Sequence, residues 1–224
     1  MESDSIRTRL IAIREDLPPN VTLVAVSKTK PIEDIESAYA EGQRDFGENR
    51  VAELVSKSEV LPKDIRWHAI GHLQTNKSKL ITPISHLIHA VDSTRIYESL
   101  SKNNESSIDV LLQVHIAQET SKYGFTEDEL LKILDSSSFE VNKDVFFNSD
   151  RIRIRGLMGM ATFTDEKTLI ASEFRGLRRF YEKIEKDMGP NFDTLSMGMS
   201  GDWRIAIDEG STMIRVGSAI FGSR

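Results

Sequence analysis

One lysine stands where a reactive amine would be useful. Lys28 follows the apolar run 21–26 in the segment VAVSKTKP. If that run is a strand, a lysine just past its end lies at the edge of the sheet with its amine facing a pocket. Burial disfavours the charged form of a lysine, and the neutral amine condenses with aldehydes to form a Schiff base. An exposed turn lysine that ends the strand explains the position equally well.

Two later segments carry the small and hydroxyl residues that suit a phosphate. Ser200 lies in LSMGMSGDW, between a predicted strand and a predicted helix, and Asp202 is available there as an N-cap. Free backbone N–H groups at such a turn, together with a serine hydroxyl, can hold a phosphate at the positive end of the helix dipole. Gly217 and Ser218 lie in MIRVGSAIFG after the last predicted strand, where barrels commonly form the second half of a phosphate site. A turn that needs glycine only for its backbone geometry is the alternative for the first segment.

Arg215 is a charged residue inside the otherwise apolar last strand. It lies on the opposite face of that strand from Ile214 and Val216. A buried guanidinium needs a partner, so we expect either an internal carboxylate or a heteroatom of a ligand beside it.

Polar residues also follow the second and third predicted strands, in FGENRV and WHAIGHLQTNK. Glu48, Asn49, His72 and Gln74 are the candidates, each of low specificity. A histidine beside glycine, as His72 is, is more often a loop residue than an acid or base. No metal site is expected, because the chain has no cysteine and its five histidines include no HExxH pair. Four methionines of the later strand ends are better explained by packing: Met158, Met160, Met197 and Met199.

The elements that position these residues alternate along the chain. Spacing of Ile6, Leu10, Ile13 and Leu17 predicts a first amphipathic helix that ends before Pro18-Pro19. Seven strand–helix pairs and a final strand follow. The predicted pairs are 21–26 with 31–41, 45–47 with 49–59, 66–71 with 75–81, 86–92 with 94–102, 108–116 with 126–135, 152–160 with 166–188 and 193–198 with 202–208, and the last strand, 213–221, has no helix after it.

This alternation predicts an α/β fold, a single (β/α)8 TIM barrel over residues 1–224 with an extra N-terminal helix. The polar stretches 101–107 and 136–150 are expected to be loop expansions, because the strand–helix rhythm resumes after each. In such barrels the carboxyl ends of the strands carry the active end, which is where the candidate residues lie.

Composition narrows the function further. The 224 residues are 39% hydrophobic and 29% charged, which is ordinary for a globular protein, and the net charge of −6 disfavours nucleic acid as a partner. The N-terminus has no apolar segment typical of secretion, and no run of apolar residues is long enough to span a membrane. We therefore expect a cytoplasmic protein, with an organelle pool such as the mitochondrial one as the alternative.

Taken together, the segments closely resemble the family of pyridoxal phosphate homeostasis proteins, which have the alanine racemase N-terminal barrel fold. The resemblance rests on VAVSKTKP, FGENRV, WHAIGHLQTNK, GLMGM, LSMGMSGDW and MIRVGSAIFG in this order, from about residue 21 to residue 222. It implies that Lys28 carries pyridoxal 5'-phosphate (PLP) as an internal aldimine. It further implies that Ser200, Gly217 and Ser218 bind the phosphate and that Asn49 lines the pocket near the ring.

The resemblance also implies that Arg215 faces the pyridine nitrogen. A fixed cation there opposes a second positive charge, so the nitrogen stays unprotonated and the ring is a weaker electron sink.

Two features depart from the family pattern. His115 stands where many relatives have asparagine, and the stretch 136–150 is longer than the usual connector.

Three functions are compatible with these residues. The first is a non-catalytic PLP carrier, with PLP-dependent apoenzymes as partners, that maintains vitamin B6 and amino-acid homeostasis. It is favoured because related racemases and decarboxylases add a C-terminal β domain, whereas this chain ends at Arg224; for the same reason a monomer is expected. The second is a small PLP-dependent racemase or decarboxylase, although no second base is obvious. The third is a phosphate-binding barrel isomerase in which Lys28 acts only through its charge.

Overall fold

A computed structural model of the chain describes residues 5–103, 107–119, 123–134 and 151–222. Its eight strands are parallel and form a closed barrel in which each strand pairs with the next and β8 pairs with β1. The strands are β1 (Thr22–Val26), β2 (Asp45–Glu48), β3 (Arg66–Ala69), β4 (Ser85–Val91), β5 (Ile108–Gln113), β6 (Ile152–Met158), β7 (Thr194–Ser196) and β8 (Met213–Val216). The predicted (β/α)8 barrel is confirmed.

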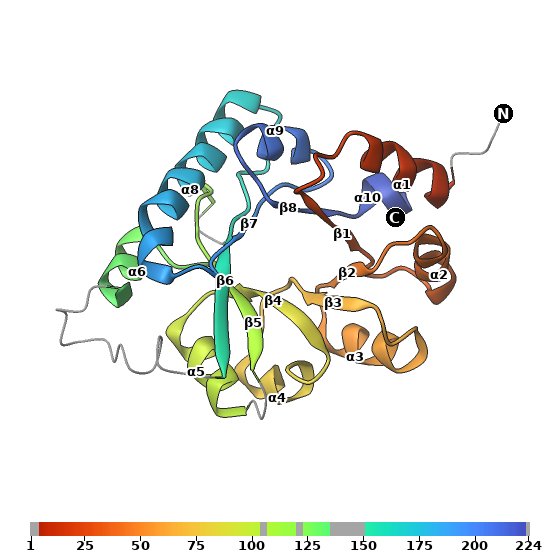
Figure 1. The fold of residues 1–224 in the computed structure, drawn as a ribbon, viewed down its shortest axis with the longest axis horizontal. Coiled ribbons are helices and arrows are strands. Elements are labelled where there is room, and N and C mark those ends of the chain that lie inside the picture. The colour runs from red at the N-terminus through yellow and green to blue at the C-terminus, as the bar shows by residue number, and fades with distance from the viewer. Residues whose placement is uncertain (1–4, 104–106, 120–122, 135–150, 223–224) are drawn as a thin grey trace.

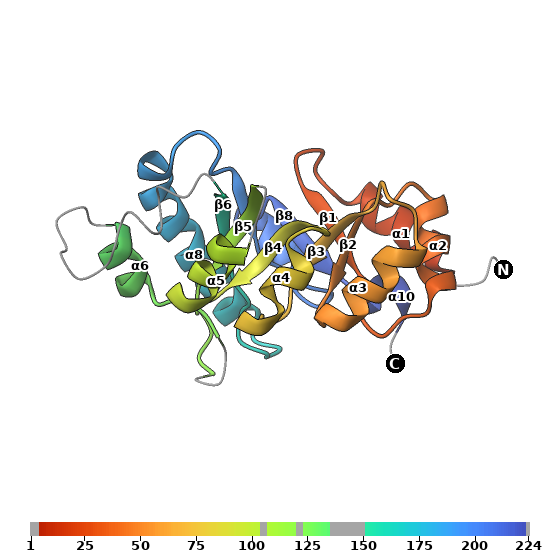
Figure 2. The same cartoon turned by 90° about the horizontal axis from the view of Figure 1, so that it is seen from below.

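Helices surround the strands on the outside of the barrel (Figure 1). They are α1 (Ile6–Glu15), α2 (Ile32–Ala40), α3 (Val51–Val60), α4 (Ser78–Ile81), α5 (Thr94–Asn103), α6 (Glu127–Leu134), α8 (Lys167–Met188), α9 (Trp203–Asp208) and α10 (Ser218–Phe221), with a 3-10 turn, η1 (Thr75–Lys77), before α4. Seen from below, α6 and α8 lie at the opposite end of the molecule from α1 and α2 (Figure 2). No helix among these described residues is long and apolar enough to cross a membrane.

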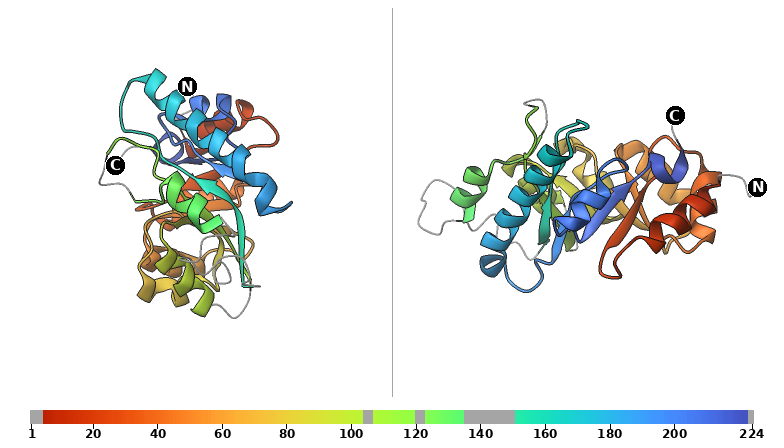
Figure 3. Two further views of the ribbon diagram at one scale, coloured as in Figure 1. Left: turned by 90° about the vertical axis from the view of Figure 1, so that its left-hand side faces the viewer. Right: turned by 90° about the horizontal axis from the view of Figure 1, so that it is seen from above.

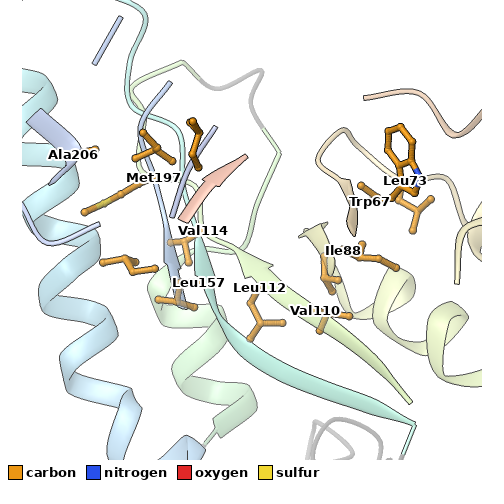
Figure 4. Close-up of a cluster of buried hydrophobic side chains, with 14 of the residues drawn as sticks. Trp67, Leu73, Ile88, Val110, Leu112, Val114, Leu157, Met197 and Ala206 are labelled. Carbon is orange, nitrogen blue, oxygen red and sulfur yellow. The ribbon is translucent and has the colours of Figure 1, made fainter. Parts of the chain in front are cut away.

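Two apolar layers hold the strands in place. In β1, Leu23 and Ala25 pack in the large cluster between the strands and the helices, whereas Val24 belongs to a small inner cluster with residues such as Leu111 and Met158. This division follows from the pleat, because successive side chains of a strand point to opposite faces. Figure 4 shows part of the large cluster, which includes Leu112, Leu157 and Met197.

The longest helix shows why the sequence periodicity was informative. Along α8, buried residues recur every three or four positions, from Ile170 through Phe174 and Leu177 to Ile184. This spacing gives the helix one apolar face, which covers the barrel. It ends at Gly189, whose φ of 84° is a conformation that favours glycine.

The prediction for the last segment was wrong. Residues 213–221 are not one strand, because β8 ends at Val216 and α10 follows from Ser218 to Phe221. Gly217 separates the two elements, and the apolar residues Ile220 and Phe221 are buried by a helical turn instead of a strand.

The other predicted elements agree with the structure to within a few residues, and the extra N-terminal helix is confirmed as α1. The predicted loop expansion at 136–150 lies outside the described residues.

The first and last helices lie side by side, as the views of Figures 1 and 3 agree. The Nε of Arg9 in α1 donates to the carbonyl of Ile220 in α10 at 2.7 Å. The additional N-terminal helix therefore supports α10, the helix that begins directly after Gly217 in the predicted phosphate segment.

Candidate functional site

The carboxyl ends of the strands surround a cavity of about 570 Å³. All six residues predicted for the site line it: Lys28, Asn49, Ser200, Arg215, Gly217 and Ser218. They come from segments that follow β1, β2, β7 and β8, except that Arg215 lies within β8 itself. The topology therefore brings together residues that are far apart in the sequence, at the end of the barrel where enzymes of this fold place their chemistry.

Lys28 is half-buried at the end of β1. Lys30, two residues later, donates its amine to the carbonyls of Phe221 and Gly222, at 2.9 and 3.1 Å, and so closes the end of α10. The Lys28 amine has no hydrogen bond or ion pair to any residue in the described part of the chain. It is thus the lysine of this loop whose amine is available to a ligand in the cavity.

The backbone directly after Lys28 is strained. Thr29 has a φ of 63°, the left-handed region that a β-branched residue rarely adopts. Its N–H donates to the Oε1 of Glu53 at 2.5 Å, which holds the loop in this conformation. Such strain persists only where surrounding contacts impose it, and it is common at ligand sites.

We expect Thr29→Gly to stabilise the fold by about 1 kcal/mol, because glycine relieves a left-handed strain of roughly 1–2 kcal/mol at a smaller entropic cost. Urea unfolding of the ligand-free protein measures this change. Thr29→Ala, which keeps the Cβ, is the control and should gain less than the glycine variant. A glycine variant less stable than the parent would show that Thr29 is not strained.

A buried ion network supports the loop from below. The Nζ of Lys57 in α3 contacts the Oε1 of Glu48 at 2.8 Å and the Oε1 of Glu53 at 2.7 Å, and it donates to the carbonyl of Ser27 at 2.8 Å. The Ser27 hydroxyl donates to the same Glu48 oxygen at 2.6 Å. Burial raises the pKa of Glu48, although Lys57 and Ser27 oppose that shift. The network fixes the residues on both sides of Lys28.

The two predicted phosphate segments meet at one hydroxyl. The Ser200 Oγ accepts hydrogen bonds from the backbone N–H of Gly217 at 3.1 Å and of Ala219 at 3.4 Å. Backbone N–H groups that converge on one oxygen in this way also suit a phosphate oxygen.

Asp202 occupies the N-cap position of α9, but its carboxylate accepts from the N–H of Met199 at 2.5 Å and makes no cap bond to the helix. Asp202 is therefore at the predicted N-cap position, but its side-chain contact shapes the loop instead of capping the helix.

Glycine is required at one position of this region. Gly198 has a φ of 99°, and a Cβ there would lie 2.6 Å from the Cβ of Ala206. The loop after β7 can therefore fold against α9 only if residue 198 has no side chain.

Arg215 is 4% exposed and points into the barrel. Its Nη1 donates to the Oγ of Ser196 at 2.5 Å and its Nη2 donates to the carbonyl of Gly159 at 2.9 Å. Burial lowers the pKa of Arg215 to about 10, although the charge of Asp202 opposes the shift. Among the described residues it forms no direct carboxylate pair, so the first of its two expected partners is absent and a ligand heteroatom in the cavity remains the second.

Asn49 is exposed at the rim of the cavity, directly after β2. The backbone of the next strand end lies very close to it, because a Cβ on Gly71 would be 2.2 Å from the Asn49 carbonyl oxygen. The backbone of Asn49 can therefore lie against the β3 end only because residue 71 has no side chain.

Three polar candidates lie away from the cavity. Glu48 faces α3, as described above, and His72 pairs with Asp92, with its Nδ1 at 2.6 Å from the Oδ2. The His72 ring also stacks on Tyr123 at 3.9 Å between centroids, so the loop interpretation of this histidine fits the geometry. Gln74 is exposed before η1.

Sequence reasoning missed part of the lining, although Met160 and Met199, which were expected to pack in the barrel and the pocket, do line the cavity. Val26 and Ile70 contribute apolar surface to the cavity wall. The segment 160–165, which follows β6, adds apolar residues and also the polar residues Thr162, Thr164 and Asp165. The only signal for them was their position at strand ends, which all eight βα segments share. Among the described residues there is no cluster of three histidine, aspartate or glutamate side chains that could hold a metal.

The donors of the cavity define the kind of molecule that fits. An available amine suits an aldehyde, convergent N–H and hydroxyl groups suit a phosphate, and a buried guanidinium suits a ring heteroatom. One molecule that carries all three groups would engage Lys28, the two phosphate-type segments and Arg215 together.

Known proteins share this architecture. The family defined by the N-terminal domain of alanine racemase matches residues 1–224. A pyridoxal phosphate homeostasis protein of Vibrio alginolyticus is 41% identical over 215 residues, which cover 92% of this chain and 88% of that protein. PipY of Synechococcus elongatus, solved without PLP, is 37% identical with a TM-score of 0.87, and the match covers 97% of this chain and all of PipY. PipY with PLP bound is 35% identical with a TM-score of 0.85 over the same shares of both chains.

Proposed function

This chain belongs to the pyridoxal phosphate homeostasis proteins, within the family of the alanine racemase N-terminal domain, and we propose that it binds PLP reversibly through Lys28 and maintains the supply of that cofactor. The observation that carries the proposal is the cavity, in which an available lysine amine, two phosphate-type segments and a buried arginine face one another. The PLP-bound state of PipY, a protein of similar sequence and fold, supports it.

The residues present fit PLP. Lys28 would hold the aldehyde carbon, while Ser200, Ser218 and the N–H of Gly217 would hold the phosphate. Arg215 would face the ring nitrogen. When bound, PLP supplies an electron sink for amino-acid chemistry, and a guanidinium beside the ring nitrogen weakens that sink.

The cavity favours a carrier over a racemase. A racemase needs two acid–base groups on opposite faces of the cofactor. Besides Lys28, the titratable residues of the lining are Lys30, Asp165, Asp202 and Arg215. Lys30 is held by the carbonyls of Phe221 and Gly222, Asp202 by the N–H of Met199, and Arg215 by Ser196 and Gly159. Asp165 is exposed in the segment after β6, and it is the residue that the racemase alternative would have to use as its second acid–base group. In our proposal the protein acts as a monomer in the cytoplasm and passes PLP to PLP-dependent apoenzymes.

Transfer distinguishes the two functions. The PLP-loaded protein should reactivate a PLP-dependent apoenzyme faster than the spontaneous release of PLP allows. The control is the same reaction in the presence of a trap that captures free PLP. No transfer above spontaneous release would overturn the carrier function. Deuterium uptake at the α-carbon of single amino acids would instead support the racemase.

The phosphate segments make a separate prediction. Ser200→Ala should weaken PLP binding about tenfold, because one hydrogen bond to a charged group is lost. Binding of pyridoxal, which lacks the phosphate, should be unchanged and serves as the control. Fluorescence titration with both ligands measures this, and an equal loss for the two would mean that Ser200 does not contact the phosphate.

A further inference from the structure

A chain of hydrogen bonds crosses the interior of the barrel and ends at Arg215. It consists of Arg66, Asp45, His68, His89, Ser196 and Arg215. Its members lie on β3, β2, β3 again, β4, β7 and β8, so it spans the barrel from the N-terminal ends of the strands to the cavity. None of the four central residues lines that cavity.

Each link of the chain is short and most are buried. The Oδ1 of Asp45 lies 3.1 Å from the Nε2 of His68, and the Nδ1 of His68 lies 2.8 Å from the Nε2 of His89. The Nδ1 of His89 lies 3.2 Å from the Oγ of Ser196, which accepts from Arg215 at 2.5 Å. His68 is 1% exposed, and His89 and Ser196 are fully buried.

If both imidazole rings are neutral, the Asp45 carboxylate at one end and the Arg215 guanidinium at the other determine which atom donates in each hydrogen bond between them. The Asp45 carboxylate can only accept, so His68 donates from its Nε2 and its Nδ1 accepts. His89 must then donate from its Nε2 and accept at its Nδ1. Ser196 therefore donates its hydroxyl hydrogen to His89, which leaves its oxygen free to accept from Arg215.

The electrostatics agree with a neutral His89 ring. Burial lowers the pKa of His89 well below its usual value, and the charge of Arg215 acts in the same direction. Burial would raise the pKa of Asp45, but its hydrogen bonds from Arg66 and His68 outweigh this and hold the pKa well below the usual range. The carboxylate end of the chain is thus charged and the imidazole that contacts Ser196 is neutral.

We propose that Ser196, His89 and His68 are positioning residues that hold the Arg215 guanidinium against the ring nitrogen of the cofactor. Without them the guanidinium would keep only the Gly159 carbonyl as a partner and could turn within the cavity. This proposal rests on the proposed function, because the ring nitrogen belongs to PLP. It adds three residues from the barrel interior to the machinery of the site.

The first test needs no cofactor. In the ligand-free protein with 15N-labelled histidines, two-bond proton–nitrogen spectra should show His68 and His89 as neutral Nε2–H tautomers at pH 7. His68→Gln and His89→Gln assign the two signals, which must be separated from those of the other three histidines. An Nδ1–H tautomer or a charged ring at either position would overturn the proposal.

The second test measures the cofactor itself. With PLP labelled with 15N at its ring nitrogen, Ser196→Ala should shift the bound ring-nitrogen resonance and weaken PLP binding about tenfold. Ser196→Thr, which keeps the hydroxyl, should restore both values. Ser211→Ala is the matched control, since Ser211 is also buried but its hydroxyl donates to backbone carbonyls, including those of Met197 at 2.8 Å and Met213 at 3.0 Å, and not to the histidine chain.

The outcomes separate the two proposals. Equal effects of Ser196→Ala and Ser211→Ala would show a merely structural role and overturn the positioning of Arg215. A parent protein that binds no labelled PLP would overturn the proposed function, and with it the positioning role, even if the histidine tautomers are as expected.

Discussion

Replacing Lys28 with alanine is expected to weaken PLP binding on the order of 100-fold, because the covalent attachment to the lysine amine is lost and only the polar contacts remain. Lys28 is the residue of the β1–α2 loop whose amine is not engaged by neighbouring carbonyls, whereas Lys30 is held by Phe221 and Gly222. Equilibrium dialysis with PLP gives the dissociation constants of the parent and the variant.

Two controls make this result specific. Lys28→Arg keeps a cation at the position but cannot form the covalent bond, so it should lose about as much affinity as the alanine variant. Binding of inorganic phosphate should be unchanged by Lys28→Ala, because the predicted phosphate contacts come from the segments after β7 and β8. If Lys28→Ala binds PLP as tightly as the parent, Lys28 is not the attachment site, and the isomerase reading gains support.

The second large effect concerns folding. Lys57→Met is expected to lower the free energy of unfolding by about 3–5 kcal/mol, because it leaves the buried Glu48 carboxylate without its cation. The side chain of Lys57 is 6% exposed and that of Glu48 is not exposed at all. The Oε2 of Glu48 has no hydrogen-bond partner in the described part of the chain, so without Lys57 the carboxylate would keep only the Ser27 hydroxyl, which donates to its Oε1.

Chemical denaturation of the ligand-free protein measures this loss. Lys102→Met is the matched control and should change stability by less than about 0.5 kcal/mol, because the Lys102 pair with Glu98 is exposed at the surface. The loss in Lys57→Met should shrink as the pH falls toward the pKa of Glu48, which burial holds above the ordinary glutamate value, since a protonated Glu48 needs no cation. A combined Glu48→Gln and Lys57→Met variant should recover part of the stability, and equal losses for Lys57→Met and Lys102→Met would contradict the account.

The fold was predictable from the sequence because its two periodicities are clear. Short β-branched runs such as 21–26 alternate with segments whose apolar residues recur every three or four positions, as along α8. The alternation predicts parallel strands, and the number of strands favours closure. The last segment was misjudged because Ile220 and Phe221 continue an apolar run past Gly217, and a short run does not distinguish a strand from a helical turn.

The cavity residues were predictable for a related reason. Lys28, Ser200 and Ser218 all follow predicted strands, and a parallel barrel brings the ends of its strands together. Residue type alone left alternatives open, such as an exposed turn lysine at position 28, and their roles toward a cofactor came from the family resemblance.

The residues that support the site were not predictable. Glu53 and Lys57 are spaced like a surface pair on a helix, yet Lys57 is buried because α3 packs beneath the loop that carries Lys28. His68 and His89 lie in apolar strands, and nothing in the sequence indicates that they touch across the barrel. These contacts depend on which strands become neighbours and with which register, information that a local pattern does not contain.

The most direct test of the central claim is an absorption spectrum of the purified protein with added PLP, before and after borohydride. We predict a visible absorption band of bound cofactor that disappears on reduction. Mass spectrometry of the digested protein should then show the reduced cofactor covalently attached to the peptide that contains Lys28. A protein that shows no band with excess PLP, or that carries the fixed cofactor on another lysine, would contradict the account.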